Sequence, residues 1–395
     1  MKLFFFYLSC FFGFIAGHMV NYSAIMYSLQ VFDSSLLAGV AYSLCFGPPI
    51  IFGWLAGSYI DRYSAKWVLL VSQNAFILGA VGMCLVMLYE PVHSMLYFLT
   101  SSFFIGIAWS FVAPARLASM GQYVPQEKLP QAMIVLNLLI MLGFGLAPVL
   151  LTQILQFVGW PGVAKTCIVL FVLSSLLLMN APNKHKRLGH QNLKQEWQAC
   201  FSELKTLPVI PQLLFAAIVG YLMMGPMQVV LPQIADRQLG LDTVQKGQYL
   251  GLIALSLIIG GLLAMVLKKY LPIGRSILVM LCLCGLSLSL LGAISSLWLS
   301  CMVLVVGTTL AGITISFIVA ALQAFTPEHI RGRVMSIYTV ISQVVSAMAG
   351  VFAGAVAQGV SVPSGLYFVA LLLVILALIL AFKASHLKGF VKFPG

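Results

Sequence analysis

Residues 52–66 read FGWLAGSYIDRYSAK, and this stretch joins an apolar segment to a charged one. Gly53 and Gly57 close the apolar run, and Asp61 and Arg62 follow at once. Glycines at such positions let two membrane helices approach closely. The order is typical of a turn at which a membrane span meets the aqueous phase. A fixed acid and base in that position suggest a moving part between two spans.

The composition is that of an integral membrane protein. Of the 395 residues, 61% are hydrophobic and 8% are charged, whereas soluble domains carry about 25% charged residues. A helical span needs about 20 apolar residues. Polar interruptions divide the chain into twelve such runs: 3–29, 36–58, 66–88, 95–119, 130–156, 163–180, 209–233, 247–267, 274–294, 297–323, 333–358 and 364–383. The runs do not alternate in polarity as barrel strands would, so we predict an all-α fold of twelve transmembrane helices.

The net charge of +12 is unevenly distributed. With both ends on one side of the membrane, only Lys165, Arg237 and Lys246 of the 21 Lys and Arg fall on the other side. The positive-inside rule then places both termini, the 181–208 segment and the Asp61 turn in the cytoplasm. The charge therefore sets the topology, and we expect a lipid bilayer and no nucleic acid as partner.

Several function classes lack their sequence signals. The start, MKLFFFYLSCFF, is not followed by the small-residue cleavage site of a signal peptide. The eight cysteines show no CxxC or Cys/His spacing, so we interpret them as reduced apolar fillers and expect no metal and no cofactor. No Walker-type loop or nucleophile motif is present. We therefore predict that the protein is not an enzyme and has no catalytic residues.

The first span carries a polar face. Residues 14, 18, 21, 22 and 25 recur at helical spacing, which brings His18, Asn21 and Tyr22 together. An ionisable residue inside a membrane is a functional hypothesis by default; the alternative is a neutral His18 hydrogen-bonded to a neighbouring helix.

Two further features, in spans two and three, are structural. Gly47, Pro48 and Pro49 should bend span two. Residues 72–74 of span three, Ser-Gln-Asn, are interpreted as interfacial.

Arg116 lies just inside the apolar run of span four, with no acid nearby in sequence. Two interpretations are open. The side chain either snorkels to the cytoplasmic interface, which we favour, or faces a polar cavity as the partner of an anion.

The chain contains an internal repeat. SFIVAALQAFTPEHIRGRVM at 316–335 echoes SFVAPARLASMGQYVPQEKLPQAM at 110–133, with Ser-Phe and V/T-P in register apart from a four-residue deletion. We predict two pseudo-symmetric six-helix halves, as many secondary transporters have: an N-terminal half at 1–180, a basic cytoplasmic linker with an interfacial helix at 181–208, a C-terminal half at 209–385 and a tail at 386–395. Lys269 stands where the second half would repeat Asp61.

With these motifs in place, the chain resembles the major facilitator superfamily over essentially its whole length. Residues 57–66 are similar to its loop motif G-x-L-x-D-R-x-G-R-R/K, with Gly57, Asp61, Arg62 and Lys66 matching and Ser64 and Ala65 departing. P-A-R at 114–116, V-P-x-E-x-L-x-x-A at 124–132 and R-G-R-V-M-S at 331–336 are similar to the branch that contains the enterobactin exporter and macrolide-efflux-like proteins.

The resemblance implies a gate on the cytoplasmic side. In that family the motif's Asp is thought to hold this side closed by facing the start of span eleven. Here the helix start, near Gly332 to Met335, carries partial positive charge beside Arg331 and Arg333. The gating residues implied are Gly57, Asp61, Arg62, Lys66, Arg331 and Arg333.

The resemblance also implies that spans one, four, seven and ten line a substrate cavity. The candidates on them are His18, Asn21, Tyr22, Trp109, Arg116, Tyr221, Met224, Gln228, Thr309, Ser316 and Gln323. None of the nine acids lies in the middle of a span, so a cationic cargo would find no carboxylate to pair with there. An unpaired cation in low dielectric is costly. A neutral or anionic amphipathic cargo therefore fits better than a lipophilic cation.

These expectations combine into a monomeric secondary transporter of the bacterial inner membrane. It would export a siderophore-like or drug-like small molecule by alternating access, in exchange for protons. Proton coupling falls to His18, with Asp33 or a passive substrate gradient as alternatives. Uptake by the same fold is the alternative direction.

Overall fold

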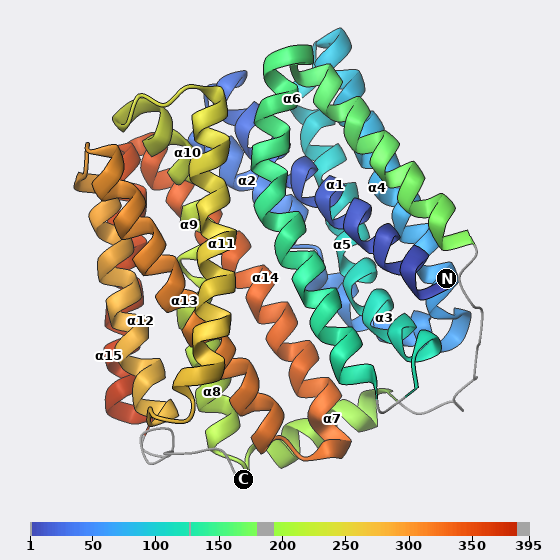
Figure 1. Ribbon diagram of the computed structural model, residues 1–395, viewed down its shortest axis with the longest axis vertical. Helices are drawn as coiled ribbons and strands as arrows, with labels where there is room; N and C mark the ends of the chain where they lie inside the picture. The colour runs from blue at the N-terminus through green and yellow to red at the C-terminus, as the bar shows by residue number, and fades with distance from the viewer. Residues whose placement is uncertain (1, 126–127, 180–192, 385–395) are drawn as a thin grey trace. The chain divides into compact units, whose positions relative to one another are not determined.

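The computed structural model describes residues 2–125, 128–179 and 193–384, and every regular element in these ranges is a helix (Figure 1). Eleven of the described helical segments are long and apolar enough to cross a membrane. The expectation of an all-α membrane protein is confirmed.

The first six helices precede the 180–192 segment. They are α1 (Lys2–Gln30), α2 (Ser35–Phe46), α3 (Pro49–Tyr63), α4 (Ala65–Tyr89), α5 (Ser94–Tyr123) and α6 (Leu129–Met179). The remaining elements are α7 (Leu193–Leu204), α8 (Val209–Tyr221), α9 (Met224–Val229), α10 (Leu231–Gln233), the π-helix η2 (Ile234–Gln238), α11 (Thr243–Leu267), α12 (Ile273–Leu290), the 3₁₀ turn η3 (Leu291–Ala293), α13 (Leu297–Phe325), α14 (Glu328–Gly359) and α15 (Val362–Lys383).

Helix α6 accounts for the difference between eleven segments and twelve predicted spans. A straight helix of its 51 residues would be about 75 Å long, far beyond the roughly 30 Å of a bilayer core. Gly159 interrupts it with φ 67° and ψ −177°, a conformation that favours glycine. The chain folds back there, and Figure 1 shows two limbs joined by a tight turn. The two limbs correspond to the predicted spans five and six.

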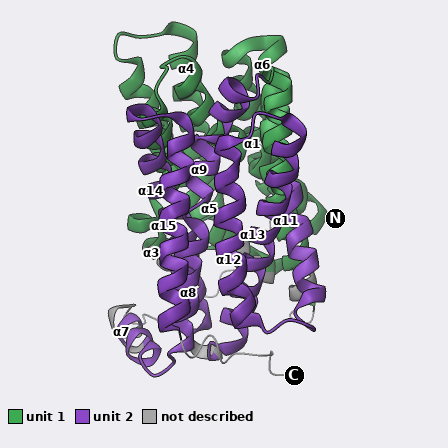
Figure 2. Cartoon of the chain, turned by 90° about the vertical axis from the view of Figure 1, so that its left-hand side faces the viewer, with its two compact units in different colours: residues 1–188, 241–254 green, residues 189–240, 255–395 purple. Residues whose placement is uncertain are grey.

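The described chain forms two compact units, coloured in Figure 2. Unit 1 comprises residues 1–188 and 241–254, and unit 2 comprises residues 189–240 and 255–395. Helix α11 is shared, since its first turns belong to unit 1. The domain boundaries drawn from the repeat stay a prediction.

The predicted bend in span two is a break in the helix. α2 ends at Phe46, Gly47 caps it, and α3 begins at Pro49. The charged turn is shorter than expected: α3 continues to Tyr63 and α4 begins at Ala65, so Asp61 and Arg62 lie in the last turn of α3. Ser64 alone joins the two helices, with φ 81° and ψ 142°.

Span seven is discontinuous as well. α8 ends at Tyr221, the short α9 begins at Met224, and the segment finishes as the π-helix η2. Pro226 and Pro232 lack the N–H that a continuous helix would use. Broken helices at membrane depth occur where the protein itself satisfies the freed backbone groups.

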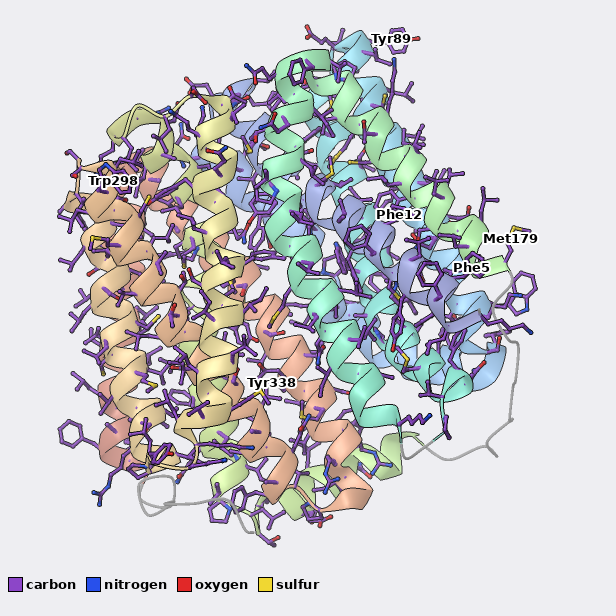
Figure 3. The ribbon with its side chains drawn as sticks, viewed as in Figure 1. Phe5, Phe12, Tyr89, Met179, Trp298 and Tyr338 are labelled. Atoms are coloured by element: carbon purple, nitrogen blue, oxygen red, sulfur yellow. The ribbon has the colours of Figure 1, made fainter. Side chains whose placement is uncertain are left out.

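Part of the predicted linker is the helix α7. Its Cys200 and Leu204 are buried, and α7 contacts α14. Trp197 and Phe201 pack against each other with ring centroids 5.9 Å apart, and Phe201 is exposed. Large aromatic side chains also lie exposed at helix ends elsewhere, such as Tyr89 and Trp298, both labelled in Figure 3. This is the usual pattern for aromatic residues at a membrane interface.

Candidate functional site

The interior of unit 1 is formed by α1, α4, α5 and α6. α1 packs along α6, and α5 packs along α4. From Gly13 to Ser28 every residue of α1 is buried. The predicted polar face of span one therefore lies inside the bundle.

His18, Asn21 and Trp109 meet in this interior. The indole Nε1 of Trp109 donates to Asn21 Oδ1 at 3.3 Å. The His18 ring lies 5.1 Å from that of Trp109 and 5.3 Å from that of Phe144. His18 Nε2 and Asn21 Nδ2 are buried without a hydrogen-bond partner. The alternative of a neutral His18 hydrogen-bonded to a neighbouring helix is therefore not what the structure shows, because aromatic rings take the place of a polar partner.

Arg116 is the only fully buried arginine among the described residues, with 1% of its side chain exposed. Its guanidinium Nη2 donates to the carbonyl oxygen of Ser9 and to Ser174 Oγ, both at 3.5 Å. The guanidinium carbon lies 4.5 Å from the ring centroid of Phe14, a cation–π contact. The favoured prediction that Arg116 snorkels to the interface is wrong, because the side chain is buried against α1 and α6.

A polar group surrounds the guanidinium. Gln73 Nε2 donates to Ser174 Oγ at 2.7 Å, and Ser174 Oγ donates to the Ser9 carbonyl at 2.8 Å. Gln73 is fully buried, so its interpretation as interfacial is wrong. Asn74, beside it, is exposed. The two residues differ because they lie on different faces of α4. A run of three polar residues does not show in the sequence which face is buried.

Phe14 and Trp109 connect the two polar groups. Phe14 stacks on Trp109 with centroids 6.4 Å apart, and Phe46 stacks on Trp109 at 6.1 Å. Phe76 meets the same indole edge-on at 5.3 Å. Tyr22 also lies at this level, with its ring 6.0 Å from that of Phe144. Phe14, Phe46, Phe76 and Trp109 form an aromatic cluster, the Trp109 cluster. The imidazole of His18, this cluster and the buried cation of Arg116 therefore follow one another along α1 and α5.

Unit 2 holds a second polar group, at the break in span seven. The hydroxyls of Tyr221 and Tyr338 are 2.7 Å apart. Ser346 Oγ donates to the Tyr221 carbonyl at 3.4 Å and to the Ser342 carbonyl at 2.8 Å. Tyr338 comes from α14 (Figure 3) and lay outside the candidate spans. A Cβ at Gly225 would meet the Ser346 carbonyl oxygen, so α9 and α14 pack backbone to backbone.

The other candidates of unit 2 are not brought together by a described contact. Gln228 is buried and Met224 half-buried on α9. On α13, Thr309 and Ser316 are half-buried near the crossing with α11 at Gly260 and Gly261, while Gln323 is exposed.

The gating candidates are only partly described. Gly57, Asp61 and Arg62 lie in α3, but their side chains are outside the described part of the structure. Lys66 Nζ donates to the Met179 carbonyl at 2.6 Å. Arg331 is exposed and donates through Nε to the Thr326 carbonyl at 3.3 Å, and Arg333 is half-buried. Helix α14 begins at Glu328, so the expected helix start near Gly332 is wrong by one turn.

Two further expectations concern titratable and metal-binding groups. Asp33, the second proton-coupling candidate, is exposed between α1 and α2. All eight cysteines are free, as predicted. No group of three or more His, Cys, Asp or Glu side chains within the described ranges is arranged to hold a metal ion.

Apolar helices here enclose a buried cation, an imidazole and polar amides. In membrane proteins, ionisable side chains that face the interior of a helix bundle mark pathways for substrates or ions. A family model described as Major Facilitator Superfamily matches residues 3–350, and the chain belongs to that superfamily. The protein is thus a multi-pass membrane transporter and not an enzyme, as the sequence predicted.

Similar proteins support this assignment. The enterobactin exporter EntS of Escherichia coli O1:K1 / APEC is 26% identical over 314 residues, which cover 78% of this chain and 73% of the relative. EntS of Shigella boydii serotype 4 (strain Sb227) gives the same figures. The predicted resemblance to the branch of the enterobactin exporter is confirmed at this level of identity.

Solved structures of low identity share the fold. A POT family transporter in complex with a thioalcohol conjugated peptide superposes with a TM-score of 0.76 at 12% identity, covering 98% of this chain and 96% of its own. A bacterial homologue of the human lysosomal transporter Spinster, inward-facing and unoccupied, gives 0.72 at 14% identity, covering 100% and 98%.

Proposed function

We propose that the protein exports a small amphipathic molecule, neutral or anionic, across the bacterial inner membrane by alternating access. Both termini would lie in the cytoplasm, and the chain would act as a monomer. The buried Arg116 is the observation that supports a neutral or anionic cargo. It lies beside the Trp109 cluster, and no acidic side chain is buried among the described residues. A lipophilic cation would meet an unpaired like charge there, which is costly in low dielectric.

The cargo class is supported by the relatives. The similar proteins are named as exporters of enterobactin, and a siderophore-like molecule combines aromatic surface with acidic groups. Stacking on the Trp109 cluster and pairing with Arg116 would suit such a cargo. A drug-like molecule of the same character is compatible with the same residues.

We further propose that His18 carries the exchanged proton. It is the residue on the polar face of α1 whose unperturbed pKa lies in the physiological range, and it lies in contact with Trp109. Asp33 and a passive substrate gradient are the alternatives. Asp61 would close the cytoplasmic side by facing the start of α14.

Cargo and direction are tested together in inverted membrane vesicles. A catecholate or carboxylate siderophore should accumulate in the vesicles when their interior is acidified, and a lipophilic cation should not. Accumulation of the cation instead would contradict the cargo class. Accumulation only in right-side-out vesicles would establish uptake, the alternative function.

A further inference from the structure

Helix α7 has an apolar stripe that the protein covers only in part. Trp197, Cys200, Phe201 and Leu204 recur at helical spacing, so they lie on one side of the helix. Cys200 and Leu204 are buried, and α7 contacts α14. Phe201 is 48% exposed and lies beside the half-buried Trp197, with ring centroids 5.9 Å apart. One edge of the stripe is therefore covered by the protein, and its aromatic edge is exposed.

The position of α7 is set by the membrane span that follows it. The N–H of Thr206 donates to the Glu203 carbonyl at 2.9 Å, and the N–H of Leu207 donates to the Leu204 carbonyl at 3.3 Å. The N–H of Ile210, in α8, donates to the Leu207 carbonyl at 3.0 Å. The chain thus turns tightly from α7 into α8, which opens a membrane-spanning segment. Because the headgroup region begins where the hydrocarbon core ends, α7 lies at the level of the lipid headgroups.

The same end of unit 2 carries an excess of positive charge. The connection between α11 and α12, the start of α14 and the end of α15 lie at this end with α7 (Figures 1 and 2). The exposed basic residues of these segments are Lys205, Lys268, Lys269, Arg275, Arg331 and Lys383.

Acidic residues do not balance this charge. Glu203 is the acid at this end whose side chain lies in the described part of the chain. The sequence adds Glu196 and Glu328, which leaves the basic residues in excess. At the opposite end of unit 2, Asp236 stands next to Arg237, so acid and base are matched there. The α7 end is therefore the basic end of unit 2.

Exposed aromatic side chains accompany the basic residues. Tyr270 follows Lys268 and Lys269, and Phe382 precedes Lys383. Aromatic rings favour the membrane interface, and clustered Lys and Arg side chains beside a membrane attract anionic lipids. A zwitterionic headgroup carries equal positive and negative charge. Charge complementarity therefore selects a phospholipid with a net negative charge.

We propose that the α7 end of unit 2 is a binding surface for anionic phospholipids, with α7 at its centre. The acyl region packs against Trp197 and Phe201, and the headgroup phosphate pairs with Lys205, four residues after Phe201. Lys268 and Lys269 extend the basic surface along the membrane. The proposal depends on the membrane span that α8 opens and not on the proposed cargo. The proposed topology decides only which leaflet supplies the lipid.

The first test compares lipids and needs neither cargo nor transport. Purified full-length protein in detergent is melted with added phosphatidylglycerol or with the same concentration of phosphatidylcholine. We expect phosphatidylglycerol to give a melting temperature higher by about 2 °C or more, and the difference should shrink as sodium chloride is raised. Equal melting in the two lipids would overturn the proposal. Sodium glycerol phosphate, a soluble headgroup analogue, should not reproduce the rise; if it does, the surface binds a free anion and the lipid proposal fails.

The second test locates the surface. Phe201→Ser combined with Lys205→Gln should lose at least half of the difference between the two lipids. The matched control is Phe157→Ser combined with Lys165→Gln, which removes an exposed Phe and an exposed Lys from α6 in unit 1 and should keep the full difference. If the α7 double variant does not fold, Lys205→Gln alone takes its place, since Lys205 is exposed beyond the end of the helix. A full difference retained in the α7 variant would remove α7 from the lipid-binding surface.

Discussion

Lys66 Nζ donates a hydrogen bond of 2.6 Å to the carbonyl oxygen of Met179, the last residue of α6. The last four carbonyls of a helix have no partner within the helix, and an ammonium group there also meets the negative end of the helix dipole. Lys66 belongs to the loop motif from which a gating role was expected. The structure gives it a local one, as a cap that ties the start of α4 to the end of α6.

Replacing Lys66 by Met should lower the free energy of unfolding by about 0.5 kcal/mol, because the exposed cap contributes at the lower end of such interactions. Chemical unfolding in detergent measures this change. Lys128→Met is the control, since Lys128 is exposed in the same unit. Equal stability of the two variants, with transport lost only in Lys66→Met, would favour the gating role.

Ser64 predicts a stabilising substitution. Its φ of 81° and ψ of 142° fall in a region that glycine enters freely and other residues rarely do. The motif that residues 57–66 resemble has Gly at this position. We expect Ser64→Gly to raise the free energy of unfolding by about 1 kcal/mol.

The matched control is Ser64→Ala, which removes the hydroxyl and keeps the Cβ. Thermal melting of both variants separates the backbone from the side chain. If Ala stabilises as much as Gly does, the effect belongs to the hydroxyl and the backbone argument fails.

The spans and the polar face of α1 could be predicted because hydropathy and helical period are local properties. The interruption at Gly47 was also predicted, as a bend, from the two prolines that follow it. The kink within α6 could not be assigned to Gly159 in advance, because the chain has many glycines and the sequence does not show which of them adopts a turn conformation. Lys66 was matched to a motif, yet its hydrogen bond depends on where α6 ends, over a hundred residues away.

Arg116 shows why the site was harder to predict than the fold. From sequence, a cation near the end of a span has a cheap route to water by snorkelling. Burial follows only because Gly13 of α1 leaves space for the guanidinium and Ser174 of α6 supplies an oxygen. Tyr338 was missed for a similar reason, since its partner Tyr221 lies 117 positions away.

Tyr338→Phe should weaken the link between α14 and the break in span seven. The variant loses the 2.7 Å contact to Tyr221 and leaves a buried hydroxyl with fewer partners, which costs about 1 kcal/mol. We expect a lower melting temperature and slower transport. Tyr270→Phe is the control, because Tyr270 is 76% exposed. A Tyr338→Phe protein as stable and active as that control would contradict the role of the pair.

His18→Gln tests proton coupling. Glutamine keeps the polarity of the side chain and cannot exchange a proton, so we expect cargo movement down its own gradient to persist while the pH gradient no longer drives accumulation. Transport in proteoliposomes, with and without an imposed pH gradient, measures both. Asp33→Asn should retain coupling; if Asp33→Asn alone loses it, the proton role passes from His18 to Asp33.

Asp61→Asn tests the proposed closure of the cytoplasmic side. The substitution keeps the size of the side chain and removes the negative charge that would face the positively charged start of α14. We expect transport to fall at least several-fold while the amount of folded protein in the membrane is unchanged, because an outward-open state that loses its closing contact is less populated.

A second measurement uses a cysteine introduced near the start of α14. Its accessibility to a membrane-impermeant thiol reagent from the cytoplasmic side should rise. Glu90→Gln, at an exposed position after α4, removes the same charge elsewhere and should leave both readouts at the wild-type level. Unchanged transport and unchanged accessibility in Asp61→Asn would remove Asp61 from the gate.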